Sequence, residues 1–518
     1  MAGRIVSGAY KIVSEKLQND EIFEENIIRI EAYESEREIT RAFDEYETDT
    51  REERELVRKI DVRILPILGL VYAAQSMDKA GMNGTRLAGK ARQFYNNNHG
   101  YSTAMTTMAV GYIALVVASN MVLSRVRPSQ FLAGILVVAG IMNALSATMP
   151  NIQSMLVARL PGATIEAVTF PAILYILSCW YKPREIGKRI AIFPAIGMIT
   201  QAISTTIARN SVAFTNNLNP WRAIFMVNGL ILLGAAPMVA YSMLDYPAIS
   251  RLLSRREREL ATIRLLRTGQ DTGSSTRLGL ERLGHVDALI ATIRDPRILL
   301  IAGLSVLLVS ASSASHLITS TSSSVLQAYS PLRAHHIAPG VFIFGLVVLA
   351  LTMVLSDRST ERRTPIIALL LAAIAGPATR LATHTGESTI IRVMANALFV
   401  AAIFSVQPLL TAWLVNTIRA PAEKRAVAIA LVHGVATTAA VGGARMWPRA
   451  NGSRTRIDAG MATSLLAIAA VAALAVPAML PLKNYRGTRA ERSLETKRRA
   501  RVAVEEMLEE EEECEKRI

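Results

Sequence analysis

The chain has 518 residues, of which 51% are hydrophobic and 19% are charged, and its formal net charge is +15 at pH 7. Its mean hydropathy of +0.30 is too high for an ordinary soluble enzyme. The basic balance does not indicate a nucleic-acid-binding protein, because the Lys and Arg residues lie in short loops between apolar runs, as topology signals of membrane proteins do. The two cysteines, Cys179 and Cys514, lie in a predicted helix and in an acidic tail, so no disulfide framework is expected.

The apolar runs predict an all-α polytopic membrane protein with about twelve membrane-spanning helices. A long polar and basic stretch near the middle of the chain divides these runs into two halves of about six helices each. We therefore expect five regions: a cytoplasmic N-terminal tail (1–58), a first six-helix bundle (59–244), a cytoplasmic linker (245–296), a second six-helix bundle (297–482) and a cytoplasmic C-terminal tail (483–518).

The first predicted span, from Val62 to about Gly84, carries charged residues in the segment MDKAGMNGTRLAG. Asp78 lies inside this span and Arg86 follows at its end. An ionisable residue is costly within a bilayer, so it marks a functional site by default. We expect Asp78 and Arg86 to belong to a substrate or proton pathway.

The fourth predicted span, from about Ser154 to Tyr181, contains Arg159 and Glu166. These residues are seven positions apart, which is about two helical turns, so they share one face of the helix. Opposite charges on a membrane helix should face a protein interior or a water-filled path rather than lipid. A pathway role is favoured, and a buried pair that only orders the bundle is the alternative.

The second half offers polar candidates within its predicted spans. His316 lies in a span rich in Ser and Thr, which either bond to neighbouring helices or line a polar path. His433 lies in another span, where it either bonds to a neighbour or relays protons near neutral pH. Asn416, at the end of the span before it, is a further pathway candidate.

A charged loop, LSDRSTERR, follows the eighth predicted span. A carboxylate and arginines at the cytoplasmic end of a helix can join neighbouring helices by charge-assisted hydrogen bonds. We expect Asp357, Arg358, Arg362 and Arg363 to join neighbouring helices in this way.

Several of these segments resemble motifs of one transporter family. The fourth span and its loop resemble a pattern R-x-x-x-G-x-x-E-A-x-x-x-P-x-x-x-Y-x-L-S-x-W-Y, which is typical of the fungal allantoate permease family of the major facilitator superfamily. Matching positions in this chain are Arg159, Glu166, Ala167, Pro171, Tyr175, Leu177, Ser178, Trp180 and Tyr181. The segments around Asp78 and Asn416 resemble the same family's motifs. The loop at Asp357 resembles a superfamily motif, which implies that it is a gating loop.

The resemblance implies a major facilitator fold and proton-coupled uptake of a small organic anion, such as allantoate, nicotinate or pantothenate. Arg159 is then expected to bind substrate charge or to gate, and Glu166 and Asp78 to couple protons or to latch helices. The motifs of spans one, five and eleven depart from the family pattern. An exporter of a fungal secondary metabolite therefore stays open, as does a non-transporting membrane sensor.

The distribution of basic loops places both termini in the cytoplasm, and we expect the chain in the plasma membrane. In this orientation Asn451 begins an outward-facing glycosylation sequon. The sequence has no phosphate-binding loop, dinucleotide fingerprint, metal-ligand cluster or catalytic constellation. We therefore expect no enzyme activity, no cofactor and no metal, with a proton gradient as the driving force. The expected partners are a carboxylate substrate and the lipid bilayer, without nucleic acid, and the chain is expected to be a monomer.

Overall fold

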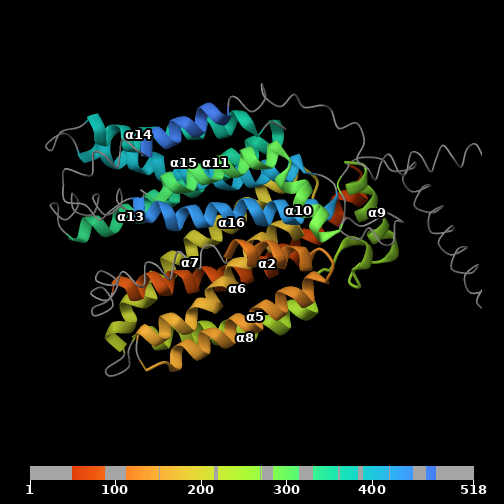
Figure 1. Cartoon of the computed structure of the whole chain (residues 1–518), viewed down its shortest axis with the longest axis horizontal. Coiled ribbons are helices and arrows are strands. Elements are labelled where there is room, and N and C mark those ends of the chain that lie inside the picture. The colour runs from red at the N-terminus through yellow and green to blue at the C-terminus, as the bar shows by residue number, and fades with distance from the viewer. Residues whose placement is uncertain are drawn as a thin grey trace, which may run out of the picture.

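The structure is a computed structural model of the whole chain. It describes residues 49–87, 112–150, 152–214, 220–268, 270, 284–313, 331–359, 362–382, 389–418, 421–446 and 462–473. Within these ranges the long helices run side by side in an elongated bundle (Figure 1). The predicted pathway residue His316, the glycosylation candidate Asn451 and the tail residue Cys514 lie outside the described residues.

Each predicted span of the first half has a helix in the described part of the chain. The helices of this half are α2 (Arg51–Leu87), Tyr112–Leu123, α5 (Pro128–Thr148), α6 (Ile152–Ser178), α7 (Ile186–Phe214) and α8 (Pro220–Ser242). α2 begins inside the predicted N-terminal tail, because its first turns are held by tertiary ion pairs that are described below. Pro66 and Pro194 lie inside α2 and α7.

The predicted linker is not wholly irregular. It contains a 3₁₀ turn, η1 (Pro247–Ile249), and two helices, α9 (Arg255–Leu266) and α10 (His285–Ile293). α9 begins with a capping box, in which Ser254 and Glu257 each accept a hydrogen bond from the other's backbone N–H. Both helices lie at the same end of the bundle (Figure 1).

The second half repeats the helical pattern. Its helices are α11 (Pro296–Ser313), α13 (Pro331–Ser359), α14 (Arg363–Ala382), α15 (Thr389–Thr417), α16 (Ala422–Met446) and Ala462–Ala473. By length and apolarity alone, three described helical segments can cross a membrane: Pro128–Thr148, Phe225–Ser242 and Ala397–Thr417. The bent pair α10 and α11 would make a fourth, and the other long helices run alongside these in Figure 1.

Glycines allow a close contact between two helices of the first half. α5 packs along α8, where a Cβ atom at Gly229 would lie 2.9 Å from the Gly140 carbonyl oxygen. A Cβ at Gly140 would lie 3.1 Å from the Gly229 carbonyl oxygen. Small residues let membrane helices approach in this way, so a larger residue at either position would push α5 and α8 apart.

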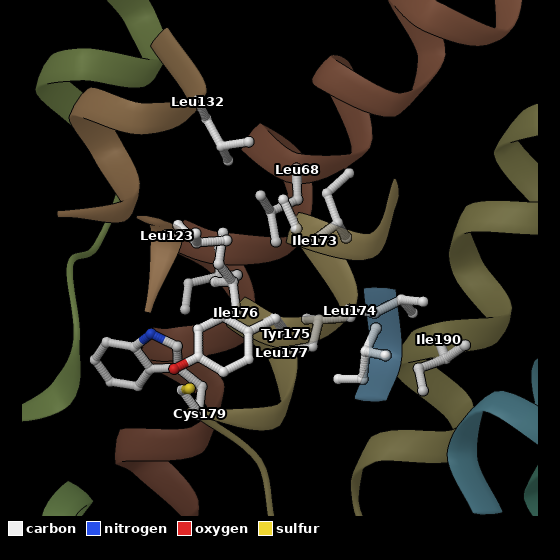
Figure 2. Packing of buried hydrophobic residues seen from close by; sticks show 14 of the residues in the cluster. Leu68, Leu123, Leu132, Ile173, Leu174, Tyr175, Ile176, Leu177, Cys179 and Ile190 are labelled. Carbon is white, nitrogen blue, oxygen red and sulfur yellow. The ribbon is translucent and has the colours of Figure 1, made fainter. Parts of the chain in front are cut away.

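The end of α6 forms the centre of the apolar core. Tyr175, Ile176, Leu177 and Cys179 are fully buried, and Figure 2 shows them packed with residues of neighbouring helices such as Leu68. A helix that is buried around its whole circumference lies between other elements rather than at a lipid surface. Here the reason is its position between the two halves, because α6 packs on α16 as well as on helices of its own half.

Candidate functional site

The two halves meet at the end of the bundle where α6 ends. Arg362 Nη2 and Asn416 Nδ2, both from the second half, donate to the Pro183 carbonyl oxygen over 2.9 and 3.3 Å. In return the Lys188 backbone N–H donates to Asp357 Oδ2 over 2.9 Å. We call this set the latch: Pro183, Gly187, Lys188, Asp357, Arg362 and Asn416.

An ion pair organises the second-half side of the latch. Arg362 Nη2 lies 2.5 Å from Asp357 Oδ1, and Arg362 Nη1 donates to Ser356 Oγ over 3.0 Å. The Arg362 side chain is almost fully buried. Charge-assisted bonds of this kind are stronger than neutral ones, and the pair presents a fixed donor and acceptor to the first half.

Gly187 allows the halves to approach this closely. A Cβ atom at this position would overlap the Asp357 carboxylate and lie 2.5 Å from Arg362 Nη1. Two of the four predicted gating residues therefore make the contact, Asp357 and Arg362. Arg358 is exposed, and Arg363 is half-buried at the start of α14.

Further contacts join the halves beside the latch. Arg425 of α16 is fully buried, and its Nη2 lies 3.3 Å from the Cys179 sulfur. The same guanidinium lies 5.9 Å from the centre of the Tyr175 ring. Asn120 Nδ2 donates to the Ala426 carbonyl oxygen over 3.1 Å. This end of the bundle is thus closed by polar contacts that bury their charged members.

A second ion cluster holds the loop after α6, which carries Pro183 of the latch. Arg264 of α9 is fully buried, and its Nη2 donates to Glu185 Oε2 and to the Trp180 carbonyl oxygen, each over 2.9 Å. Its Nη1 lies 3.6 Å from Glu53 Oε1 on α2, and Lys182 also pairs with Glu53. We call Glu53, Lys182, Glu185 and Arg264 the linker cluster. It ties α2, the loop after α6 and α9 into one unit.

α7 is fixed to α2 by a neighbouring pair. Arg189 Nε and Nη2 donate to the two Asp61 carboxylate oxygens, each over 2.7 Å. The Arg189 guanidinium also stacks over the Tyr181 ring at 4.1 Å. A bidentate arginine–carboxylate pair fixes orientation as well as charge, so α7 enters the latch at a defined angle.

Glu257 links α9 to α2 in a pH-dependent way. Burial alone would raise the pKa of its carboxyl, but hydrogen bonds from Lys59 and from the Ser254 N–H outweigh burial and lower the pKa below 4.5. A lowered pKa gives stability that is present above pH 4.5 and is lost as the pH falls through the folded-state pKa. We expect the protection of α9 against hydrogen exchange, measured relative to the intrinsic exchange rate at each pH, to decrease in acid below that point, and Glu257→Gln to remove most of this pH dependence. An unchanged dependence in the variant would assign it to other carboxyl groups.

The centre of the bundle holds a polar and aromatic set. Gln75 Nε2 on α2 donates to Thr169 Oγ1 on α6 over 2.5 Å, and Gln75 is buried. The Phe170 ring lies 5.3 Å from the Tyr72 ring and 5.1 Å from the His433 ring. His433 is therefore placed on α16 at the contact between the halves, half-buried against an aromatic ring.

The remaining predicted pathway residues are placed by their backbones only. Asp78 and Arg86 lie in α2, and Arg159 and Glu166 lie in α6, but their side chains are outside the described residues. Asn416, predicted as a pathway residue, contributes its amide to the latch. Sequence reasoning missed the linker cluster, because no local pattern shows that Glu53 in a charged tail and Arg264 in a polar linker become buried together.

The comparisons with known proteins identify the family. Residues 68–444 match the model of the Major Facilitator Superfamily. Over 411 residues the chain is 23% identical to an uncharacterized transporter of Schizosaccharomyces pombe, in an alignment covering 77% of this chain and 81% of that protein.

Two further relatives have named substrates. Identity is 23% over 207 residues to the high-affinity nicotinic acid transporter of Saccharomyces cerevisiae, covering 40% of this chain and 39% of that protein. It is 24% over 235 residues to the pantothenate transporter liz1 of Schizosaccharomyces pombe, covering 44% and 45%. Each of these two matches spans less than half of the relative.

Solved structures share the fold. The human organic anion transporter MFSD10 superposes with a TM-score of 0.58 at 12% identity, over 80% of this chain and 99% of that one. The proton:xylose symporter XylE superposes with a TM-score of 0.56 at 16% identity, over 85% and 99%. Because the family model matches well over half of the sequence, the chain belongs to the Major Facilitator Superfamily and is a multi-pass membrane transporter, not an enzyme.

Proposed function

We propose that this transporter takes up a small organic carboxylate together with protons, in the manner of the allantoate permease branch. The named substrates of two relatives, nicotinic acid and pantothenate, are both small carboxylic acids and support this class. Arg159 on α6 would supply a fixed positive charge for the carboxylate, since a guanidinium binds such a group by two parallel hydrogen bonds.

The observation that carries the coupling proposal is the bond between Gln75 and Thr169. It fixes α2 against α6 at a buried level of the bundle. Asp78 follows Gln75 by three residues and Glu166 precedes Thr169 by three. Because α2 and α6 run in opposite directions, both backbone positions lie nearly one turn beyond the bond, on the same side of it. Two carboxylic acids at one level of adjoining helices are suited to bind and release a proton.

The latch fits the cycle of uptake that we propose. We propose that both termini and the latch lie in the cytoplasm and that the chain resides in the plasma membrane, as the basic loops indicate. With this end closed by the latch, substrate would reach the central residues from outside. Uptake would then require the latch to open, and its re-formation would complete the cycle.

Uptake of radiolabelled carboxylates into cells that express the chain tests this function. The measurement compares about pH 5 with about pH 7.5, with and without a protonophore, because a proton-coupled carrier responds to both. Accumulation that is higher in acid and abolished by the protonophore is the expected result. Absence of uptake of every compound, from protein shown to reach the surface, would favour export or a non-transporting sensor.

Glu166→Gln tests the coupling role directly. The variant keeps the size and polarity of the side chain but cannot release a proton, so we expect accumulation against a gradient to fall at least about tenfold. Facilitated exchange of substrate without a gradient should persist. Glu55→Gln is the matched control, because Glu55 is an exposed residue of the first turns of α2. Equal loss of exchange and accumulation would show that Glu166 serves structure or substrate binding instead.

A further inference from the structure

α10 is set apart from the membrane-spanning helices by its direction. It covers His285–Ile293, and only two residues separate it from α11. The chain bends by 70° between these helices. Because α11 belongs to the parallel helices of the second half, a bend of this size lays α10 closer to the plane of the membrane than to its normal (Figure 1).

One face of α10 is packed and another is apolar but uncovered among the described residues. Ala288 and Thr292, four positions apart, are fully buried, and Ala288 packs in a cluster that includes Val116 and Val427. The uncovered face carries Val286, Ile290 and Ile293, which are 68%, 41% and 49% exposed. Their spacing of four and three residues places these three side chains on one stripe of the helix.

A third, polar face separates the apolar stripe from the rest. Asp287 and Arg294 are seven positions apart and both exposed, so they share a side of the helix. Beyond the bend, Leu299 of α11 is 50% exposed, as a residue of a lipid-facing helix surface would be. The apolar stripe of α10 is therefore followed, one helix later, by apolar surface of a membrane span.

We infer that α10 is an interfacial helix, which inserts Val286, Ile290 and Ile293 into the cytoplasmic boundary between lipid headgroups and acyl chains. An in-plane helix with one apolar stripe and one charged face fits this boundary, where the charged side remains among water and headgroups. Arg294 is placed to meet lipid phosphates at the end of the helix. The occupant of the stripe is the bilayer, because it already surrounds the adjoining span.

The position of α10 connects the membrane surface to the contact between the halves. α10 packs on α16, and Asp295, just after α10, lies with its Oδ2 2.7 Å from Lys424 Nζ. The next residue of α16 is Arg425, whose guanidinium contacts Cys179 of the first half. Insertion of α10 into the leaflet would therefore hold the cytoplasmic end of α16 in place.

Fluorescence quenching by nitroxide-labelled lipids tests the seat of α10. The full chain with Cys514→Ser carries one added cysteine, Ile290→Cys or Asp287→Cys, labelled with an environment-sensitive dye and placed in lipid nanodiscs. Labelling of the Cys514→Ser parent measures the background from the buried Cys179. Val286→Cys provides a second stripe position if the first variant folds poorly.

We expect quenching at Ile290 or Val286 to exceed that at Asp287 at least about twofold, with blue-shifted emission at the stripe. Equal, weak quenching at all positions would show that the stripe faces water and would overturn the inference. Blue-shifted emission without lipid quenching would equally overturn it, because another protein surface would then cover the stripe.

Discussion

Replacement of Gly187 by valine should hold the cytoplasmic end of the transporter open and abolish most substrate uptake. The valine side chain needs space that the Asp357 carboxylate and the Arg362 guanidinium occupy in the closed latch. Overpacking of this kind costs about 1–3 kcal/mol, which shifts the open–closed equilibrium roughly 5–150-fold. Relief of the clash requires the Asp357 carboxylate and the Arg362 guanidinium to move away from Lys188 and Pro183, to which they bond in the closed latch. We therefore expect the cost to fall mainly on the closed state.

Alkylation of Cys179 measures the opening independently of transport. Cys179 is fully buried where the two halves meet, beside Arg425. In a Cys514→Ser background, Gly187→Val should make Cys179 react faster with a maleimide that is added from the cytoplasmic side. Normal uptake with a protected Cys179 would contradict the assignment of Gly187 to the latch.

Matched glycines of the same chain provide the control. Gly134→Ala and Gly303→Ala add a methyl group where no heavy atom lies within 4 Å of the new Cβ, one in each half. Gly187→Ala, which already overlaps the latch, should fall between these controls and the valine variant in both uptake and alkylation. A graded response would separate steric opening from general misfolding.

The helices were predictable wherever one physical signal dominates. The fourth predicted span, from about Ser154 to Tyr181, agrees with α6 (Ile152–Ser178) within a few residues at each end, because most of the segment is apolar. The start of α2 was not, since Arg51, Glu52 and Glu53 resemble a solvated tail until their partners are known. α10 was not predicted for a related reason, because the sequence of a short helix with one polar face resembles that of a polar linker.

Only the side-chain half of the latch was predictable from the sequence. Asp357 and Arg362 stand in a loop motif whose charges were expected to join neighbouring helices. Their acceptor and donor in the first half are backbone groups of Pro183 and Lys188, and a backbone group leaves no mark in a sequence. The sequence reflects that contact only at Gly187, where any side chain would collide with Asp357 and Arg362.

Replacement of Arg264 by methionine should cause the largest loss of stability. Methionine fills a similar volume, but it removes the guanidinium that donates to Glu185 and to the Trp180 carbonyl and that lies beside the Glu53 carboxylate. Removing one partner of a buried ion pair costs about 3–5 kcal/mol, because the remaining charge stays desolvated. We expect a clear decrease in Tm of the purified full chain and faster proteolysis within the linker around α9.

Arg256→Met on the same helix is the control for charge removal. Arg256 also pairs with a glutamate of α2, Glu52, but its side chain is 80% exposed and that of Glu52 is 61% exposed. Exposed pairs contribute about 0–1 kcal/mol, so this variant should unfold close to the parent temperature. Similar small shifts for both arginines would show that burial of Arg264 carries no special cost.

A double replacement shows whether the lost stability of Arg264→Met comes from buried carboxylates without a partner or from lost packing of α9. If the cost of Arg264→Met arises from carboxylates that are left buried, then adding Glu53→Gln should recover part of the stability, although it removes a further charged residue. If the cost arises only from lost packing of α9, the second replacement should destabilise further. Recovery would also restore uptake in part, because the linker cluster holds Lys182 and Glu185, which flank Pro183, the residue on which Arg362 and Asn416 close.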